Sequence, residues 1–106
     1  MSDLRRDNGR LRLSGRVDFE SVPGLYRDSL AIKRAESAPK EIDLAEVEHI
    51  DSAGLALLLE WESWARQEGT RIQLSNPPQQ LLMLAELSEL QTVLDFQSSE
   101  TASNEV

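Results

Sequence analysis

The spacing of apolar side chains predicts a strand hairpin at the amino terminus. Leucine alternates with arginine over residues 10–13, and this period-two pattern is typical of a strand with one buried face. Residues 7–9, with the sequence Asp-Asn-Gly, are typical of a turn between two strands. We therefore expect a hairpin whose second strand ends between residues 15 and 17.

Three later segments have the apolar spacing of amphipathic helices. They span residues 22–35, 53–68 and 79–87. Pro23 suits a first helical turn, where its missing N–H group costs nothing, and Gly69 is typical of the residue that follows a helix. Shorter apolar runs predict strands or strand-like elements. They fall at residues 41–44, 71–75 and 93–96. Residues 46–51 are expected to form a connection.

Strands that alternate with helices indicate an α/β domain with a mixed sheet and with helices mainly on one face. The chain has 106 residues, which is enough for one compact core. We assign residues 1–96 to this single domain. Residues 97–106 are polar and acidic with little to bury, so we expect a disordered tail.

The charge and the residue content exclude several classes of function. A formal net charge of −8 argues against binding nucleic acid and against attraction to an anionic membrane surface. The chain has no cysteine, and therefore no disulfide or thiol nucleophile. Its longest apolar run, residues 53–59, is far shorter than the roughly 20 residues of a membrane helix. Residues 1–6 do not resemble a secretory signal. We expect a cytoplasmic protein without direct membrane insertion.

Motifs of enzymatic chemistry are also missing from the sequence. It contains no Gly-rich nucleotide fingerprint, no P-loop and no zinc-protease motif. The only histidine, His49, lies in the expected connection, and we interpret it as a surface or loop-packing residue. We therefore expect no enzymatic activity, no metal and no cofactor.

The segment "HIDSAGLALLLEW" (residues 49–61) contains the most informative local pattern. An acidic residue and a serine, Asp51 and Ser52, stand directly before an apolar helix. The Ser52 hydroxyl is expected to cap this helix, and Asp51 favours its dipole. A helix start of this kind also accommodates an anion such as phosphate. Gly54 either permits close approach of another backbone or only weakens the first turn.

The same helix has more apolar surface than one core face requires. Two stripes follow from the helical period. The first contains Leu55, Leu58, Leu59 and Ala65, and the second contains Leu57, Trp61 and Trp64. One stripe faces the sheet. The tryptophans either pack under the neighbouring helix or form part of an interface. Glu62 is expected to reach from the edge of the first stripe toward Arg66.

Four stretches in order make the chain resemble the STAS domain, a fold shared by anti-sigma-factor antagonists and small subunits of some transporters. They are "LRLSGRVD" (residues 11–18), "EIDLAEVEHIDSAGLALLL" (residues 41–59), the turn at Gly69, and "RIQLSNPPQQLLMLAEL" (residues 71–87). The resemblance implies a mixed sheet of four or five strands. In the antagonist branch a kinase-type anti-sigma factor phosphorylates the motif serine. Carried over, that residue is Ser52, with Asp18 and Asp51 on the same surface.

The run "GLALLL" after a hydroxyl residue resembles one branch more closely, the STAS subunits of Mla phospholipid-transport ABC systems. This resemblance implies a non-enzymatic subunit that binds and supports the cytoplasmic ATPase and, through it, the membrane permease. Its role would be maintenance of outer-membrane lipid asymmetry. The expected partner-binding or regulatory residues are Asp18, Asp51, Ser52, Ala53, Gly54, Leu55, Trp61 and Trp64. The alternative is an anti-sigma-factor antagonist regulated by phosphorylation of Ser52.

Overall fold

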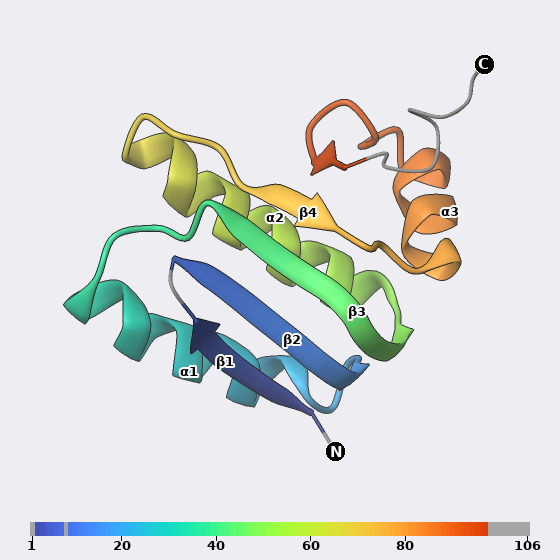
Figure 1. Ribbon diagram of the computed structural model, residues 1–106. Coiled ribbons are helices and arrows are strands. Elements are labelled where there is room, and N and C mark those ends of the chain that lie inside the picture. Colours follow the sequence, from blue (N-terminus) through green and yellow to red (C-terminus); the bar gives the residue numbers. More distant parts are fainter. Residues whose placement is uncertain (1, 8, 98–106) are drawn as a thin grey trace.

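The computed structural model describes residues 2–7 and 9–97, which form a five-stranded sheet and three helices (Figure 1). The strands are β1 (Asp3–Asp7), β2 (Arg10–Val17), β3 (Glu41–Ile50), β4 (Gln73–Ser75) and β5 (Asp95–Phe96). The helices are α1 (Val22–Ala35), α2 (Ser52–Gln67) and α3 (Gln79–Leu87).

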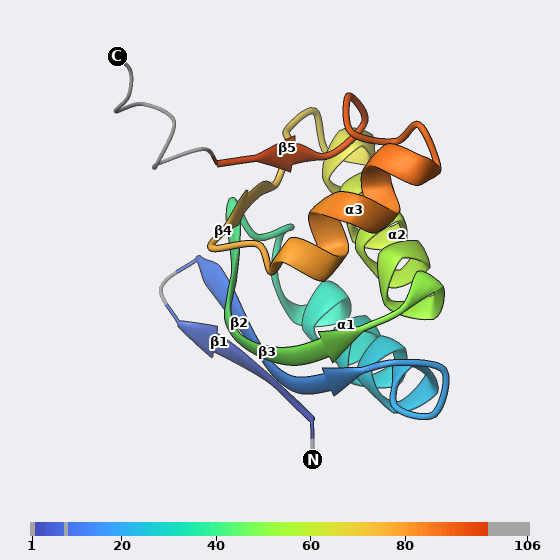
Figure 2. The same ribbon diagram turned by 90° about the vertical axis from the view of Figure 1, so that its right-hand side faces the viewer.

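The sheet is mixed, with strand order β1-β2-β3-β4-β5. The hairpin pair β1 and β2 is antiparallel, whereas β2, β3, β4 and β5 pair successively in parallel. Parallel neighbours need a crossover connection, and each crossover here contains one helix. Figure 2 shows all three helices on the same side of the sheet. The expected α/β class, with a mixed sheet and helices on one face, is confirmed.

The core lies between the sheet and the helices. The two leucines of the alternating pattern, Leu11 and Leu13, are fully buried. Both apolar stripes of α2 reach the core, because α2 packs against the sheet and also against α1 and α3. Trp61 is among the largest fully buried side chains.

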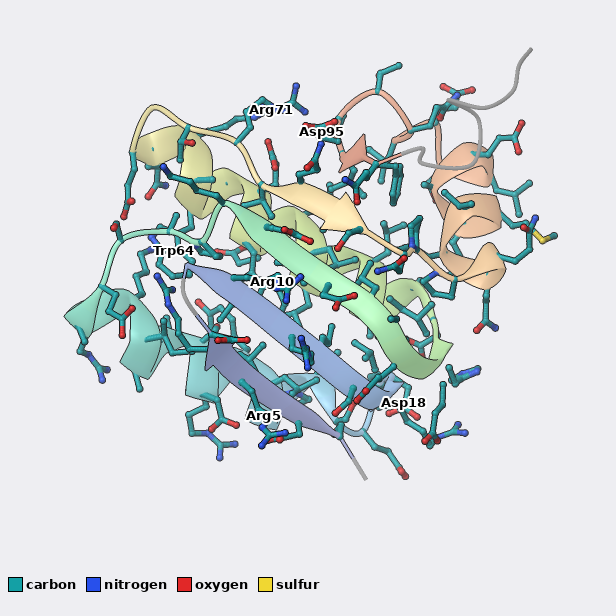
Figure 3. All side chains as sticks on the ribbon, in the orientation of Figure 1. Arg5, Arg10, Asp18, Trp64, Arg71 and Asp95 are labelled. Atoms are coloured by element: carbon teal, nitrogen blue, oxygen red, sulfur yellow. The ribbon has the colours of Figure 1, made fainter. Side chains whose placement is uncertain are left out.

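The open face of the sheet is polar, and charged side chains extend from it toward the viewer in Figure 3. Arg10 lies 3.6 Å from Glu41, and Arg12 lies 3.8 Å from Asp43 across the β2–β3 pair. These strands therefore alternate between a buried apolar face and a solvated charged one.

Strand β3 is longer than the sequence indicates, and the expected connection at residues 46–51 is wrong. β3 continues to Ile50, which pairs with Val17 of β2. The segment "EVEH" is exposed or half-buried, so it has no continuous apolar face to indicate a strand, and the β2–β3 pairing shifts register twice along it. His49 accordingly lies in a strand, partly buried, and not in a loop.

The remaining bounds differ little from the expectations. Helix α3 has the expected bounds, β4 begins two residues late, and β5 falls within the expected last element. Gln97, the first residue of the expected tail, donates its backbone N–H group to the Leu74 carbonyl at 2.8 Å. The rest of that tail, residues 98–106, lies outside the described residues.

Candidate functional site

The candidate site forms where two neighbouring parallel strands end and two helices begin. Val17 and Ile50 are paired at the ends of β2 and β3, so the following residues, Asp18 and Asp51, enter adjacent loops. The Asp51 N–H group donates to the Val17 carbonyl at 3.3 Å. In open α/β sheets this edge, beyond the carboxyl ends of the strands, is the usual place for binding.

Asp51, and not Ser52, caps helix α2. Its Oδ1 atom accepts hydrogen bonds from the N–H groups of Ala53 at 2.9 Å and Gly54 at 3.2 Å. The expected capping role of Ser52 is therefore wrong. An aspartate is as good a cap as a serine, and the extended backbone of Asp51 places it one residue before the helix. Its carboxylate already accepts the hydrogen bonds of the N–H groups that would otherwise attract an anion.

The second carboxylate oxygen of Asp51 joins α2 to the loop before α1. Oδ2 accepts a hydrogen bond from the Phe19 N–H group at 3.1 Å. In the same loop, Asp18 Oδ1 accepts from the N–H groups of Glu20 and Ser21, both at 3.1 Å. Asp18 thus precedes α1 and orders the turn into it.

The environment of Asp18 favours its charged form. The hydrogen bond from the Ser21 N–H group lowers the pKa of Asp18 most strongly. Burial raises the pKa, but the Arg16 guanidinium at 3.0 Å and the Glu20 N–H group lower it further. The net result is a lowered pKa. The carboxylate is negative at neutral pH and 8% exposed. Asp18 therefore stabilises the loop, and little of its side chain is accessible to a partner.

Gly54 is required for close packing of α2 against the strand ends. A Cβ atom at this position would lie 2.5 Å from the Val17 carbonyl oxygen and 2.5 Å from Cγ1 of Ile50. Of the two readings of Gly54, close approach of another backbone is confirmed, and the approaching backbone belongs to this chain.

Ser52 is exposed on the first turn of α2, and it directly precedes Ala53, which lines a shallow apolar groove. The groove has a volume of about 220 Å³ and runs between α1 and α2. It is lined by Val22, Tyr26, Ala53, Ala56, Leu57 and Glu60. Ala53 therefore belongs to an accessible surface, as expected.

Two aromatic residues at this surface are missing from the sequence-based candidates. Phe19 is 80% exposed, and Tyr26 is 38% exposed at the groove. Phe19 continues the period-two spacing of Leu11, Leu13 and Val17, but it lies beyond the end of β2, in the loop before α1. Its spacing therefore predicts a buried side chain, and only the loop conformation exposes it.

The three large apolar side chains among the expected partner-binding residues are buried. Leu55 and Trp64 are each 4% exposed, and Trp61 is 1% exposed. The Trp64 Nε1–H group donates to Glu68 at 2.8 Å. Figure 3 places Trp64 far from Asp18, toward the other end of the molecule. The tryptophans follow the packing alternative, so we exclude all three from the docking surface.

Glu62 is buried more deeply than expected. Its Oε2 atom lies 3.5 Å from Arg66, the expected partner, and 3.3 Å from Arg71. The Ile72 N–H group donates to the other carboxylate oxygen at 3.4 Å. Glu62 therefore ties α2 to the segment before β4, away from the candidate site.

The residues at the strand ends present a hydroxyl, two aromatic rings and several carboxylates. Within residues 2–7 and 9–97, no three side chains of His, Cys, Asp or Glu come together as a metal site would require. The helices of these ranges are also too short or too polar to cross a bilayer.

A mixed sheet with helices on one face, and a serine exposed on the first turn after a central strand, define a STAS-type domain. The family model described as "Mlab, STAS domain" matches residues 1–95. The chain belongs to this family.

The chain is similar to members of both expected branches. It is 29% identical over 90 residues to the intermembrane phospholipid transport system binding protein MlaB of Haemophilus influenzae, covering 80% of this chain and 86% of that protein. It is 25% identical over 87 residues to the anti-sigma-B factor antagonist of Bacillus subtilis, covering 82% of this chain and 79% of that protein.

A solved assembly contains a similar chain. One chain of the Acinetobacter MlaFEDB complex in an ATP-bound conformation is 31% identical, with a TM-score of 0.70. The alignment covers 88% of this chain and 98% of that one. The structural and sequence likenesses therefore each extend over most of the chain.

Proposed function

We propose that this chain is the non-enzymatic STAS subunit of a phospholipid-transporting ABC complex. In this role it binds the cytoplasmic ATPase subunit, supports its activity, and reaches the membrane permease only through that subunit. The protein would then lie at the cytoplasmic side of the inner membrane without inserting into it. The complex would contribute to outer-membrane lipid asymmetry.

The observation that carries this proposal is the exposed Ser52 beside the groove between α1 and α2. A surface that combines a small hydroxyl, two alanines and the edge of Leu57 allows close approach of a partner. The similarity to MlaB of Haemophilus influenzae and to a chain of the Acinetobacter MlaFEDB complex supports the identity of that partner.

The proposal predicts that Ser52→Asp abolishes binding to the ATPase without unfolding the protein. An aspartate in a tight interface is a desolvated charge without an evident partner, which costs several kcal/mol of binding free energy. Binding is measured by calorimetric titration of the purified chain into the ATPase subunit of the same organism's transporter. Melting temperatures by circular dichroism are expected to agree within a few degrees.

Ser63→Asp is the matched control, because Ser63 is an exposed serine on the same helix but lies far from its first turn, near the other end of α2. It introduces the same charge and should retain binding. Equal binding by wild type, Ser52→Asp and Ser63→Asp would show that the start of α2 is not the interface. Failure of the wild type itself to bind the ATPase would refute the proposed function.

The second candidate function is that of an anti-sigma-factor antagonist. It is favoured by the 25% identity to the Bacillus subtilis antagonist and by the exposure of the Ser52 hydroxyl. A phosphate on Ser52 would, however, add about −1.5 to −2 charges beside the Asp51 carboxylate, which already holds the helix amides. Incubation with the organism's anti-sigma kinase and ATP, followed by mass spectrometry of Ser52, tests this candidate.

A further inference from the structure

Phe19 is a large apolar side chain that the fold leaves outside the core. It is 80% exposed, whereas most other large apolar residues described in the structure are buried or half-buried. An exposed aromatic residue is favoured at protein interfaces and is unfavourable in water. The question is therefore whether the loop of Phe19 is loosely placed or built to present it.

The backbone on both sides of Phe19 is fixed by hydrogen bonds. Asp18 accepts from Glu20 and Ser21 through its side chain, and the Asp18 N–H group donates to Ser21 Oγ at 2.9 Å. The Phe19 N–H group itself donates to Asp51 Oδ2 at 3.1 Å. The loop is thus ordered before any partner binds, which lowers the entropy cost of binding.

Phe19 is also connected to the groove through a single carboxylate. The Oδ2 atom of Asp51 accepts the hydrogen bond from the Phe19 N–H group. Its Oδ1 atom accepts from the first turn of α2, which contains Ser52. The backbone of Phe19 is therefore tied to the first turn of α2 by one side chain. Phe19 also lies in the loop that leads into α1, whose residues Val22 and Tyr26 line the groove.

The charges around Phe19 indicate the chemistry of the surface that it would meet. Asp18, Glu20 and Asp51 are acidic, and among the described residues only Asp18 of these three forms an ion pair, with Arg16 at 3.0 Å. Glu20 is exposed, and the whole chain has a formal net charge of −8. Complementarity requires a partner surface with cationic side chains around an apolar pocket.

We propose that Phe19 is the anchor residue of the interface with the ATPase subunit, inserted into an apolar pocket bordered by lysine or arginine. The inference rests on the proposed function and assigns it a contact chemistry. Anchors of this kind concentrate binding free energy, so truncation of one ring has a much larger effect than truncation of a peripheral residue. The neighbouring Glu20 adds attraction that depends on salt concentration.

The test compares Phe19→Ala with Leu87→Ala in titrations against the purified ATPase subunit. Leu87, on α3, is also 80% exposed, so the two variants remove similar apolar side chains from water-exposed positions. Phe19→Ala should weaken binding at least about 30-fold, and Leu87→Ala by no more than about 3-fold. Both variants should melt close to the wild type, because neither side chain lies in the core.

Two further variants test the chemistry of the pocket. Phe19→Leu keeps an apolar side chain and should bind more tightly than Phe19→Ala. Glu20→Lys should weaken binding more than Glu20→Gln at low salt, and this difference should shrink as salt is added. Equal affinities of Glu20→Lys and Glu20→Gln at low salt would overturn the cationic border.

The outcomes separate this inference from the function on which it rests. Loss of binding by Ser52→Asp together with wild-type binding by Phe19→Ala would leave the proposed function intact and refute the anchor. Similar losses for Phe19→Ala and Leu87→Ala would also refute it. Absence of binding by the wild-type chain would refute both the anchor role of Phe19 and the proposed function.

Discussion

At the residue scale, the neighbours Asp51 and Ser52 have different roles: Asp51 stabilises the fold, and Ser52 lies on the surface. Asp51 makes three hydrogen bonds through its carboxylate, to Phe19, Ala53 and Gly54. Ser52 is exposed, and its hydroxyl has no hydrogen-bond partner in the described ranges. The fold therefore depends on the aspartate and leaves the serine available for contact.

These different roles predict that two alanine substitutions lower the free energy of unfolding by different amounts. Asp51→Ala removes the cap of α2 and should lower the free energy of unfolding by about 1–2 kcal/mol. Ser52→Ala changes an exposed position and should lower it by no more than about 0.5 kcal/mol. Urea denaturation followed by circular dichroism measures both. A Ser52→Ala cost as large as that of Asp51→Ala would mean that the hydroxyl caps the helix after all.

The sequence alone could not assign the cap between these two neighbours. Aspartate and serine are equivalent capping residues, and helix ends are uncertain by one or two positions. The same limit applies to Phe19, because its exposure depends on a loop conformation that is set by Asp18 and Asp51. Long-range hydrogen bonds of this kind have no periodic signature in the sequence.

At the element scale, the position of α2 depends on its contact with the ends of β2 and β3. Gly54 allows the helix backbone to approach the Val17 carbonyl and the Ile50 side chain. The Val17 carbonyl cannot easily move, because it also accepts the Asp51 N–H group. The first turn of α2 is thereby held at a fixed distance from the strands.

Gly54→Ala and Gly24→Ala should therefore have opposite effects. Alanine favours a helix over glycine by about 1 kcal/mol, and Gly24 in α1 has nothing within 4 Å of an added Cβ atom. Gly24→Ala should raise the free energy of unfolding by up to about 1 kcal/mol. Gly54→Ala should lower it by about 1–3 kcal/mol, since the helix must shift away from the strands. Denaturation midpoints of both variants give the comparison; stabilisation by Gly54→Ala would contradict the close contact.

Elements with a clear periodic spacing of apolar residues were predictable from the sequence, and elements without it were not. Helix α3, with its leucine-rich sequence, has the bounds that its apolar spacing indicates. The second half of β3 is not predictable in this way, because residues such as Glu46 and Val47 are exposed or only half-buried and form no apolar face. For α2, periodicity identified two apolar stripes, but only packing against both α1 and α3 decides that both are buried.

At the scale of the whole molecule, the fold separates a polar sheet face from the helical side (Figure 2). Buried carboxylates connect segments that are distant in sequence. Asp43 of β3 accepts hydrogen bonds from Asn76, after β4, at 3.0 Å and from Ala45 at 3.0 Å. The link between β3 and the segment after β4 therefore depends on the ionisation of Asp43.

The ionised form of Asp43 is favoured in the folded state. Burial raises the pKa of Asp43, but the hydrogen bonds from Asn76 and Ala45 and the nearby Arg10 and Arg12 guanidiniums outweigh it, so the pKa is lowered. A carboxyl group whose pKa is lower in the folded than in the unfolded state stabilises the fold above its unfolded-state pKa. That stabilisation is lost as the pH falls through the folded-state pKa.

Asp43→Asn should accordingly destabilise the protein in a pH-dependent way. At pH 7 the loss of a charged hydrogen-bond acceptor should lower the free energy of unfolding by about 1–3 kcal/mol. The difference between wild type and Asp43→Asn should stay constant above about pH 5 and shrink below about pH 4. Asp28→Asn, at an exposed position of α1, is the control for the change in net charge. Urea denaturation of the three proteins from pH 7 to pH 3 measures these differences. A difference between wild type and Asp43→Asn that grows as the pH falls would mean that burial, and not hydrogen bonding, dominates at Asp43.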